Sequence, residues 1–541
     1  MNATILDSST EPMGGSLRRW RASAFPAVLG GLLGLAGIGL FARIMTYPLR
    51  HDEQMYMPVG ALLRQGDLYR DFGFNNFPNL PLLMALVFGV SGTDHYLLTA
   101  RLVIFSAWLL AALAMALLAW RGAGSAIASV LAALLLMTNP LLLGQAGMLA
   151  TNNFLPMAFA ISGTCLFIAG LDREKPSSLI IAAAGLCLGI ALGFKANYVF
   201  LVPPFAVAAL LVPARLPHTQ RIRYVILPLL IGGVIGSTPV LLYLVRDPAG
   251  FVAHVINYHR GPHIDYWTAN PSLNGPKVMS LIGKMKLAAS LWLGGGGIVI
   301  LIAATYGVWA NARKGPARAT PASRPMWPIW LLAALAVGGA IISFVPTPAF
   351  PQYYILPIPF VIALAALSYG RLPDKDRKRL APWLCGITLL VILTGMPRLL
   401  VSLPQIATPQ SWAGYQAHAA GQAVAAAVAQ GGAAGPIATL APIYPLEGGL
   451  KVYPELAAGP LVYRVGDMIP IDDQKHYRMI SPARLPDLLA SQPPAAILTG
   501  LEGELDAQFV AYARTNGYHL LAEPVLSDRY GTARLYLKPM P

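Results

Sequence analysis

The sequence predicts a mostly α-helical, polytopic membrane protein with about eleven transmembrane helices and a small C-terminal α/β domain. Of its 541 residues, 56% are hydrophobic and 12% are charged, whereas about 25% of a soluble globular domain is charged. The mean hydropathy is +0.57. Apolar runs of roughly 17–24 residues recur along the chain, and a helix of that length crosses a bilayer.

The first span is expected at Phe25–Thr46, after a polar segment, residues 1–24, that we predict to be cytoplasmic. This run of about 22 residues is too long for a signal-peptide core. The run Asn79–Gly92 is only about 14 residues long, which favours a re-entrant or interfacial helix. The remaining spans are expected at about 97–120, 124–140, 149–170, 178–195, 197–213, 223–246, 288–310, 327–345, 351–369 and 380–401. Within the span at 288–310, the run Gly294–Gly297 predicts a close helix contact.

The charge distribution predicts the topology. Residues up to 402 carry a net charge of +17 and residues from 403 onward a net charge of −2. Much of the basic excess lies in alternate short loops, as the positive-inside rule expects, so the charge does not indicate nucleic-acid binding. The prediction is a membrane domain at 25–402 whose loops 47–96 and 247–287 face outward, followed by an extracytoplasmic domain at 403–541.

The C-terminal segment combines helix and strand signals. Trp412–Gln430 is an Ala-rich helix that would end at Gly431, and Leu505–Asn516 is a second helix closed by Gly517. Ala495–Thr499 and Arg534–Leu537 have the composition of short strands. These elements predict a small α/β domain.

The polar, aromatic stretch Arg50–Pro81 is the first candidate for chemistry. Asp52 and Glu53 follow the first span within a few residues, and ionisable groups near hydrocarbon persist mainly when they are paired or functional. A carboxylate there would serve as a base for an attacking hydroxyl or amine. Tyr56 and Tyr69 are candidate substrate contacts from the same stretch. The alternative is an interfacial cap, in which the acids cap a helix and the aromatic residues form a belt.

Lys195 is an independent candidate, because the predicted topology places it at the outer end of a span. Its ammonium would bind a lipid phosphate, although a lysine that binds lipid headgroups generically would occupy the same place. Arg70 is a second phosphate candidate, and Arg260 a weaker one.

The pattern of a first span, Asp-Glu and then Y…G…LYRD…P..PLL resembles the GT-C superfamily of polyprenyl-phosphate-sugar-dependent glycosyltransferases. The branch with protein O-mannosyltransferases and the lipid A aminoarabinose transferase is the most similar. GFKANY, which contains Lys195, and FPQYYILPIP at Phe350–Pro359 are looser similarities. The latter makes Tyr353 and Tyr354 candidates for the lipid-facing groove.

This resemblance implies a reaction and roles for several residues. Asp52 would be the catalytic base with Glu53 in support, and the sugar would be transferred with inversion from a polyprenyl-phosphate donor to a lipid, glycan or protein acceptor. Many relatives carry another acidic residue in the next outward loop. The corresponding segment here, Met148–Asn153, reads MLATNN and has no carboxylate.

The long loop at 247–287 contains a histidine cluster. The spacing of three residues, His259, His263 and Asp265, is compatible with metal binding. A catalytic zinc, however, usually needs three well-placed ligands. A divalent metal is therefore possible but not supported by the sequence, and no cofactor is predicted. Contact between His259 and the acceptor, or ordinary loop packing, is the preferred interpretation.

Two other functional classes stay open. A transporter or flippase for a lipid-linked or polar substrate would place ionisable residues within spans, and these spans are nearly free of acidic residues. A non-catalytic membrane scaffold would tolerate replacement of Asp52 by Asn. The high Ala, Leu, Gly and Pro content favours a bacterial inner membrane.

Overall fold

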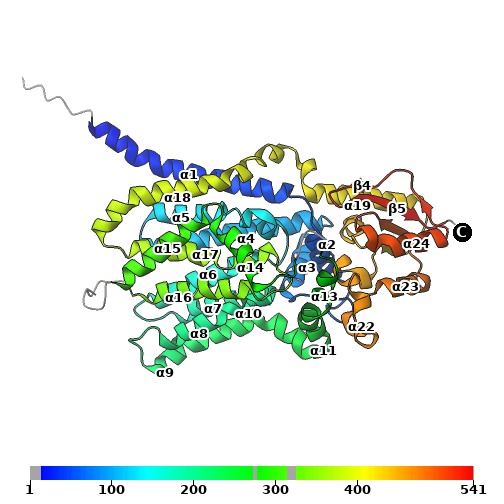
Figure 1. The fold of residues 1–541 in the computed structure, drawn as a ribbon, viewed down its shortest axis with the longest axis horizontal. Coiled ribbons are helices and arrows are strands. Elements are labelled where there is room, and N and C mark those ends of the chain that lie inside the picture. Colours follow the sequence, from blue (N-terminus) through cyan, green and yellow to red (C-terminus); the bar gives the residue numbers. More distant parts are fainter. Residues whose placement is uncertain (1–13, 272–276, 314–324, 540–541) are drawn as a thin grey trace, which may run out of the picture.

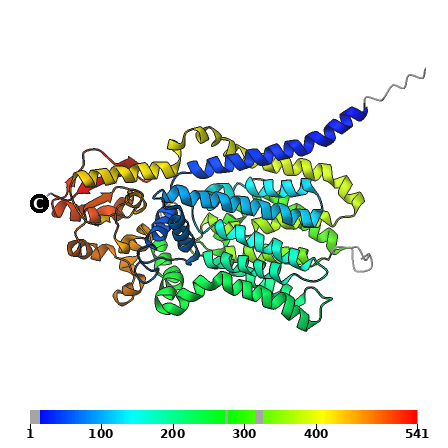
Figure 2. The same cartoon turned by 180° about the vertical axis from the view of Figure 1, so that it is seen from behind.

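The computed structural model describes residues 14–271, 277–313 and 325–539. A bundle of long helices occupies one end of the molecule, and the C-terminal region, residues 403–539, forms the other (Figures 1 and 2). The first thirteen residues of the predicted cytoplasmic N-terminus lie outside the described residues. The bundle contains α1 (Gly14–Thr46), α2 (His51–Leu62), α3 (Asn79–Ser91), α4 (Tyr96–Ala123), α5 (Ala126–Met137), α6 (Leu155–Leu171), α7 (Ser178–Phe194), α8 (Val202–Leu211), α9 (His218–Arg221), α10 (Leu227–Arg246), α11 (Pro248–Val252), α12 (Tyr258–Arg260), α13 (Pro262–Ala269), α14 (Leu281–Leu293), α15 (Gly297–Ala312), α16 (Trp327–Ser343), α17 (Ile358–Gly370) and α18 (Asp374–Leu400).

The apolar helices confirm a polytopic membrane protein, but the predicted number of eleven spans is not confirmed. By length and composition, five helices in the described part of the chain can cross a membrane, or six if one bent pair is a single span. Shorter apolar helices of 10–17 residues accompany them. The five long helices are Pro26–Thr46, Tyr96–Ala123, His218–Arg246, Pro351–Gly370 and Asp374–Ala407.

The structure has a bent pair of helices where the sequence predicts a single span at 288–310. Helix α14 ends at Leu293 and α15 begins at Gly297, and their axes differ by 88°. Gly295 and Gly296 have φ angles of 56° and 82°, a region that residues with a side chain rarely adopt. The glycine run therefore breaks the helix as well as allowing a close contact.

Small residues let α7 and α10 pack closely. A Cβ atom added to Gly232 would lie 1.9 Å from the carbonyl oxygen of Ala182, and one added to Gly189 would lie 2.3 Å from that of Gly233. Helices in a bilayer associate through such close backbone contacts, because lipid provides no hydrophobic driving force between them.

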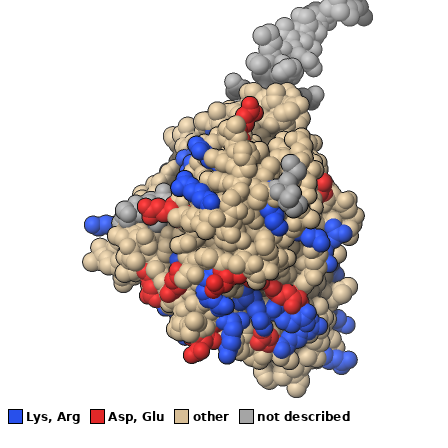
Figure 3. Space-filling view, turned by 90° about the vertical axis from the view of Figure 1, so that its right-hand side faces the viewer, with Lys and Arg blue, Asp and Glu red and all other residues tan. Residues whose placement is uncertain are grey.

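The C-terminal region contains the predicted small sheet. Its strand order is β1-β2-β5-β3, with β4 also paired to β5; β1 and β2 are parallel and the other pairs are antiparallel. Acidic and basic side chains are mixed on the face seen in Figure 3, in keeping with the small net charge of this region. The elements are α19 (Ala413–Gln430), β1 (Ile437–Ala438), α20 (Ile443–Glu447), α21 (Pro460–Tyr463), α22 (Ile471–Tyr477), α23 (Leu485–Ser491), β2 (Ala496–Thr499), α24 (Ala507–Thr515), β3 (His519–Leu520), β4 (Leu526–Ser527) and β5 (Thr532–Leu537).

Candidate active site

Helix α2 carries both predicted acids and lies where the helical bundle meets the C-terminal region (Figure 1). Asp52 and Glu53 occupy its first turn, where a negative charge is favoured by the helix dipole. Consecutive residues of a helix point in directions about 100° apart, since 3.6 residues make one turn. The two carboxylates therefore face different surroundings.

Asp52 lies deep in the protein among polar side chains that act on one another: Gln145, Lys195 and, through Lys195, Asn153. This group of four side chains is called the Asp52 pocket. Its Oδ2 atom accepts a hydrogen bond of 3.2 Å from Nε2 of Gln145. The side chain is half-buried, so part of the carboxylate surface stays accessible although the residue lies deep in the protein. Burial raises the pKa of Asp52, and the Gln145 hydrogen bond and the charge of Lys195 partly offset that rise. Asp52 is thus an accessible carboxylate of increased basicity.

Lys195 lies in the same pocket, directly after the end of α7. Its Nζ atom donates a hydrogen bond to Oδ1 of Asn153 and lies 4.8 Å from the centre of the Tyr353 ring. Burial lowers the pKa of Lys195 to about 8, although Asp52 acts in the opposite direction. Within the described ranges, no carboxylate lies within 4 Å of this ammonium. An anionic ligand would therefore find an unneutralised cation.

A chain of side-chain amides connects three loops around this pocket. The Tyr56 hydroxyl donates to Oδ1 of Asn152 at 3.1 Å, and Nδ2 of Asn152 donates to Oδ1 of Asn76 at 3.1 Å. Nδ2 of Asn76 donates to Oδ1 of Asn75 at 3.0 Å, and Nε2 of His259 donates to the Asn75 carbonyl oxygen at 2.7 Å. The pocket walls are thereby fixed by neutral hydrogen bonds.

The sequence did not predict roles for Gln145, Asn152 and Asn153. The segment Met148–Asn153 lacks a carboxylate, and neutral amides give no charge signal of a site. In the structure its amides bind Tyr56, Asn76 and Lys195 instead. The signal available in the sequence was the pair of adjacent amides in a loop between apolar runs.

Four of the predicted substrate contacts lie near Asp52 or Lys195. Tyr56 and Tyr353 are close enough to Asp52 to interact with its charge. The positive charge of Lys195 acts on His259, and burial lowers the pKa of that imidazole. Tyr56, Tyr353, His259 and Lys195 therefore lie near one another, and their contact with a substrate stays a prediction.

The structure places the other predicted contacts elsewhere. Arg70 is exposed and forms ion pairs with Asp67 and Asp71, and its contact with a phosphate stays a prediction. Arg260 is also exposed. Tyr354 is fully buried, and its ring packs against Trp292 and Phe344.

Tyr69 supports the loop and is not accessible to a substrate. It is 1% exposed and has a φ angle of 66°, which is uncommon for a residue with a side chain. Its hydroxyl donates to the Asn76 carbonyl oxygen, and its ring packs edge-on against Tyr243 and Phe251. These contacts hold the loop in the conformation that positions Asn76.

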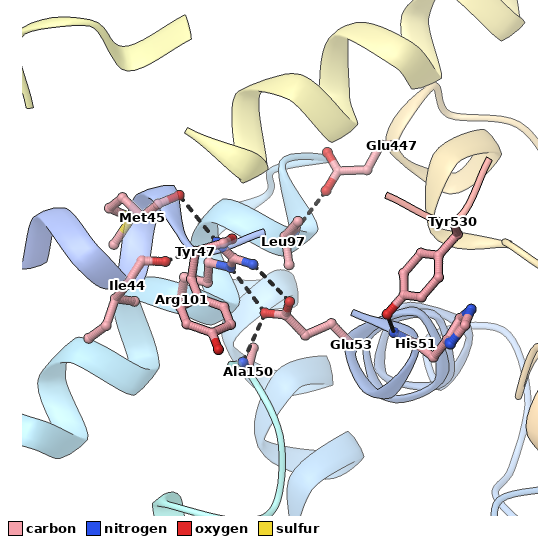
Figure 4. A network of polar contacts seen from close by, with 10 residues as sticks. All are labelled: Ile44, Met45, Tyr47, His51, Glu53, Leu97, Arg101, Ala150, Glu447 and Tyr530. Atoms are coloured by element: carbon pink, nitrogen blue, oxygen red, sulfur yellow. Dashed lines mark hydrogen bonds and ion pairs between the residues drawn. The ribbon is translucent and has the colours of Figure 1, made fainter. Parts of the chain in front are cut away.

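Glu53 forms a fully buried ion pair with Arg101 of α4 (Figure 4). Nε and Nη2 of Arg101 donate to the two carboxylate oxygens at 3.0 and 2.8 Å. Nη1 of Arg101 donates to the carbonyl oxygens of Ile44, Met45 and Tyr47, and the Ala150 amide donates to Glu53 at 2.9 Å. Glu53 therefore joins α2 to α1, α4 and the loop that contains Asn152. These contacts favour a positioning role for Glu53 over the predicted direct support of the base.

The histidine spacing of the long loop does not form a metal site. His259 is hydrogen-bonded to Asn75, His263 stacks on Tyr258 with a centroid distance of 5.3 Å, and Asp265 is exposed. Within the described part of the chain, these three residues do not bring ligand atoms together.

An apolar cavity of about 700 Å³ is lined in part by Ala196, the residue after Lys195. Phe77 and Tyr198 also line it, and residues of α7, α8 and α10 form most of its wall. The cavity thus offers a hydrocarbon-lined surface that includes the chain neighbour of Lys195.

Solved structures with the same architecture include ArnT from Cupriavidus metallidurans. Its complex with undecaprenyl phosphate matches with a TM-score of 0.60 and 14% identity over 95% of this chain and 98% of that chain. The apo state matches over the same shares, with a TM-score of 0.60 and 15% identity. The oligosaccharyltransferase of Archaeoglobus fulgidus, in a complex with Zn and sulfate, has a TM-score of 0.44 and 12% identity over 89% of this chain and 69% of that chain. No protein-family model and no curated protein sequence matches this chain.

The ArnT similarity confirms the predicted GT-C-like fold. At 14–15% identity, this agreement concerns the fold. The roles of individual residues rest on the pocket described above.

Proposed function

We propose that this protein is an integral membrane glycosyltransferase that moves a sugar from a polyprenyl-phosphate carrier to a lipid, glycan or protein acceptor. The observation that carries the proposal is the interaction between the charges of Asp52 and Lys195, together with an apolar cavity lined by Ala196, the residue after Lys195. A carboxylate, an ammonium and a hydrocarbon-lined cavity match the three parts of such a reaction: an acceptor proton, a phosphate and a prenyl chain.

Asp52 would take the proton from the acceptor hydroxyl or amine as that group attacks the anomeric carbon. The bond between this carbon and the phosphate oxygen breaks, and its electron pair leaves with the phosphate. The product has the opposite anomeric configuration because attack and departure occur on opposite faces. An accessible carboxylate with a raised pKa suits the first step.

Lys195 would hold the phosphate in the donor and as the leaving group. A charge-assisted hydrogen bond to phosphate stabilises the charge that develops as the bond breaks, without a general acid. Tyr353 lies below the ammonium and Asn153 accepts its hydrogen bond, so the cation is oriented before the donor arrives.

The prenyl chain would occupy the apolar cavity between α7, α8 and α10. The ArnT structure bound to undecaprenyl phosphate supports a donor of this kind for a chain with the same fold. The distribution of basic loops supports a multi-pass protein of a bacterial inner membrane, with a cytoplasmic N-terminus and an extracytoplasmic C-terminal region.

The test is release of polyprenyl phosphate from a panel of purified polyprenyl-phosphate sugars, supplied with lipid, glycan and peptide acceptors. Wild type should consume at least one donor, and NMR of the product should show inversion at the anomeric carbon. Asp52→Asn should abolish turnover, whereas Asp71→Asn, which removes an exposed carboxylate from the same loop, should not. Equal turnover by wild type and Asp52→Asn would contradict the proposed base, and no turnover across the panel would contradict the proposed activity.

A further inference from the structure

A second polar cluster lies where the turn before α4 meets helix α19 of the C-terminal region. Asp94 and His95 come from the turn, and His418 comes from α19. One ligand atom from each of these residues lies within 4.8 Å of the other two. None of the residues surrounding Asp52 and Lys195 belongs to this cluster.

A buried carboxylate orients His418. Oε2 of Glu447 lies 3.1 Å from Nδ1 of His418, and Oε1 of Glu447 accepts a hydrogen bond of 2.7 Å from the Leu97 amide (Figure 4). Because Nδ1 of His418 is held by Glu447, its Nε2 atom is the nitrogen that a metal ion would use, in place of its present 3.4 Å contact with Nε2 of Gln422. Metal-binding histidines usually have this arrangement, with the second ring nitrogen bound to a carboxylate or carbonyl.

His95 has a buried nitrogen that lacks a hydrogen-bond partner in the described part of the chain. The atom is Nδ1, and its ring stacks on that of His418 with a centroid distance of 3.6 Å and an interplanar angle of 24°. An unsatisfied buried polar atom is destabilising, and a bound cation would remove that cost. The stack brings the two imidazoles close together, but their nitrogen lone pairs lie in the ring planes, so the rings must rotate out of the stack to bind one ion.

We propose that Asp94, His95 and His418 bind a divalent transition-metal ion of the zinc class. Two imidazole nitrogens and one carboxylate oxygen suit zinc better than magnesium or calcium, which prefer oxygen ligands. Ligand atoms of a tetrahedral zinc are separated by roughly 3.3 Å, given Zn–N distances near 2.0–2.1 Å. The three side chains must therefore rotate so that their ligand atoms surround the ion. All three side chains are at least partly exposed.

The position of the site gives the ion a structural role. It would join the N-terminal end of α4 to α19, and so fasten the C-terminal region to the helical bundle. Leu97, whose amide binds Glu447, precedes Arg101 of the Glu53 ion pair by one helical turn. The bound ion would therefore stabilise α4, the helix whose Arg101 positions α2.

The experiment uses the full-length, tag-free protein in detergent, stripped with EDTA and then incubated with Zn²⁺ alone. Elemental analysis should find about one zinc per chain in wild type, and calorimetry should show binding that excess Mg²⁺ does not displace. His95→Ala and His418→Ala should weaken zinc binding at least tenfold. Glu447→Gln should weaken it by about 10–100-fold, the usual effect of losing such a supporting group.

His519→Ala is the matched control, because His519 lies exposed on β3, outside the cluster. It should bind zinc like wild type. Asp94→Asn changes an exposed side chain at constant size, so a zinc affinity reduced in this variant cannot be ascribed to misfolding. Zinc should also raise the melting temperature of wild type and of His519→Ala but not that of His418→Ala. Failure of wild type to bind zinc stoichiometrically, or binding by His418→Ala equal to that of wild type, would overturn the proposal.

Discussion

Asp52 and Glu53 are adjacent in the chain, yet their surroundings differ in every respect that matters for chemistry. Asp52 has one side-chain hydrogen bond, keeps an accessible surface and lies near the unneutralised ammonium of Lys195. Glu53 is 0% exposed, and both its oxygens are used by Arg101 and the Ala150 amide. A carboxylate that is fully buried against a guanidinium is not accessible to a substrate, whereas the partly exposed Asp52 is. We therefore propose that Asp52 is the reactive acid and that the Glu53–Arg101 pair holds α2 in place.

The largest effect on folding should come from breaking the Glu53–Arg101 pair. Arg101→Leu leaves a buried carboxylate without its partner and frees three backbone carbonyl oxygens. Loss of one member of a buried ion pair typically costs about 3–5 kcal/mol. We expect a markedly lower melting temperature in detergent, measured by the fluorescence of a thiol-reactive dye or by light scattering.

The double variant Glu53→Gln/Arg101→Leu is the control for that experiment. Removing both charges should restore part of the lost stability, because the uncompensated buried charge is gone. If Arg101→Leu is as stable as wild type, the Glu53–Arg101 pair does not stabilise the fold. The proposed difference in role between Asp52 and Glu53 would then be wrong.

Lys195→Gln should affect donor binding and leave stability nearly unchanged. A hydrogen bond to a charged group contributes about 1.5–3 kcal/mol, so KM for the donor should rise by roughly 10–150-fold. Lys195→Arg should retain a large part of the affinity because it keeps the charge. An unchanged KM in Lys195→Gln would remove Lys195 from the phosphate site.

The pH profile of kcat/KM should fall at both low and high pH, because Asp52 titrates on the acid side and Lys195 on the alkaline side. Burial raises the pKa of Asp52, so the base should become protonated, and activity should fall, at a higher pH than an ordinary aspartate would predict. Burial lowers the pKa of Lys195 to about 8, so its charge is lost as pH rises through about 8 and donor affinity should fall there. Lys195→Arg should shift the alkaline limb upward, since arginine stays protonated; an alkaline limb that this variant leaves in place would contradict the assignment.

The smallest effect is expected for Arg70→Ala. Its guanidinium is exposed and pairs with Asp67 and Asp71, and exposed ion pairs contribute about 0–1 kcal/mol. Turnover and KM should stay within about twofold of wild type, in steady-state assays run beside Lys195→Gln. A tenfold increase in KM would show that Arg70 reaches the donor after all.

The sequence predicted the features that depend on hydrophobic length and on local pattern. Apolar runs identified a membrane protein, and the short run at Asn79–Gly92 corresponds to the 13-residue helix α3. Strand composition located β2 and β5. The bend between α14 and α15 was not predicted. Glycines in a helix can either allow a close helix contact or break the helix, and the φ angles that packing imposes decide between the two.

The division of roles between the two acids could not be predicted from the sequence. Glu53 and Arg101 are 48 positions apart, and only the packing of α2 against α4 brings them together. Arg101 stood in a predicted span as an isolated charge, which was a signal for a buried partner. Gln145, Asn152 and Asn153 are neutral, so no charge pattern distinguished them from ordinary loop residues.

The most direct test of the account is a side-by-side measurement of donor turnover and melting temperature in Asp52→Asn and Glu53→Gln. For Asp52→Asn we predict turnover reduced by about 10²–10⁴-fold, the range for loss of a general base, with the melting temperature of wild type. For Glu53→Gln we predict a lower melting temperature. At a low temperature, where this variant stays folded, its turnover per folded molecule should return toward that of wild type. Turnover near that of wild type in folded Asp52→Asn, or the same loss of activity at full stability in both variants, would contradict the central claim that one carboxylate reacts and the other positions it.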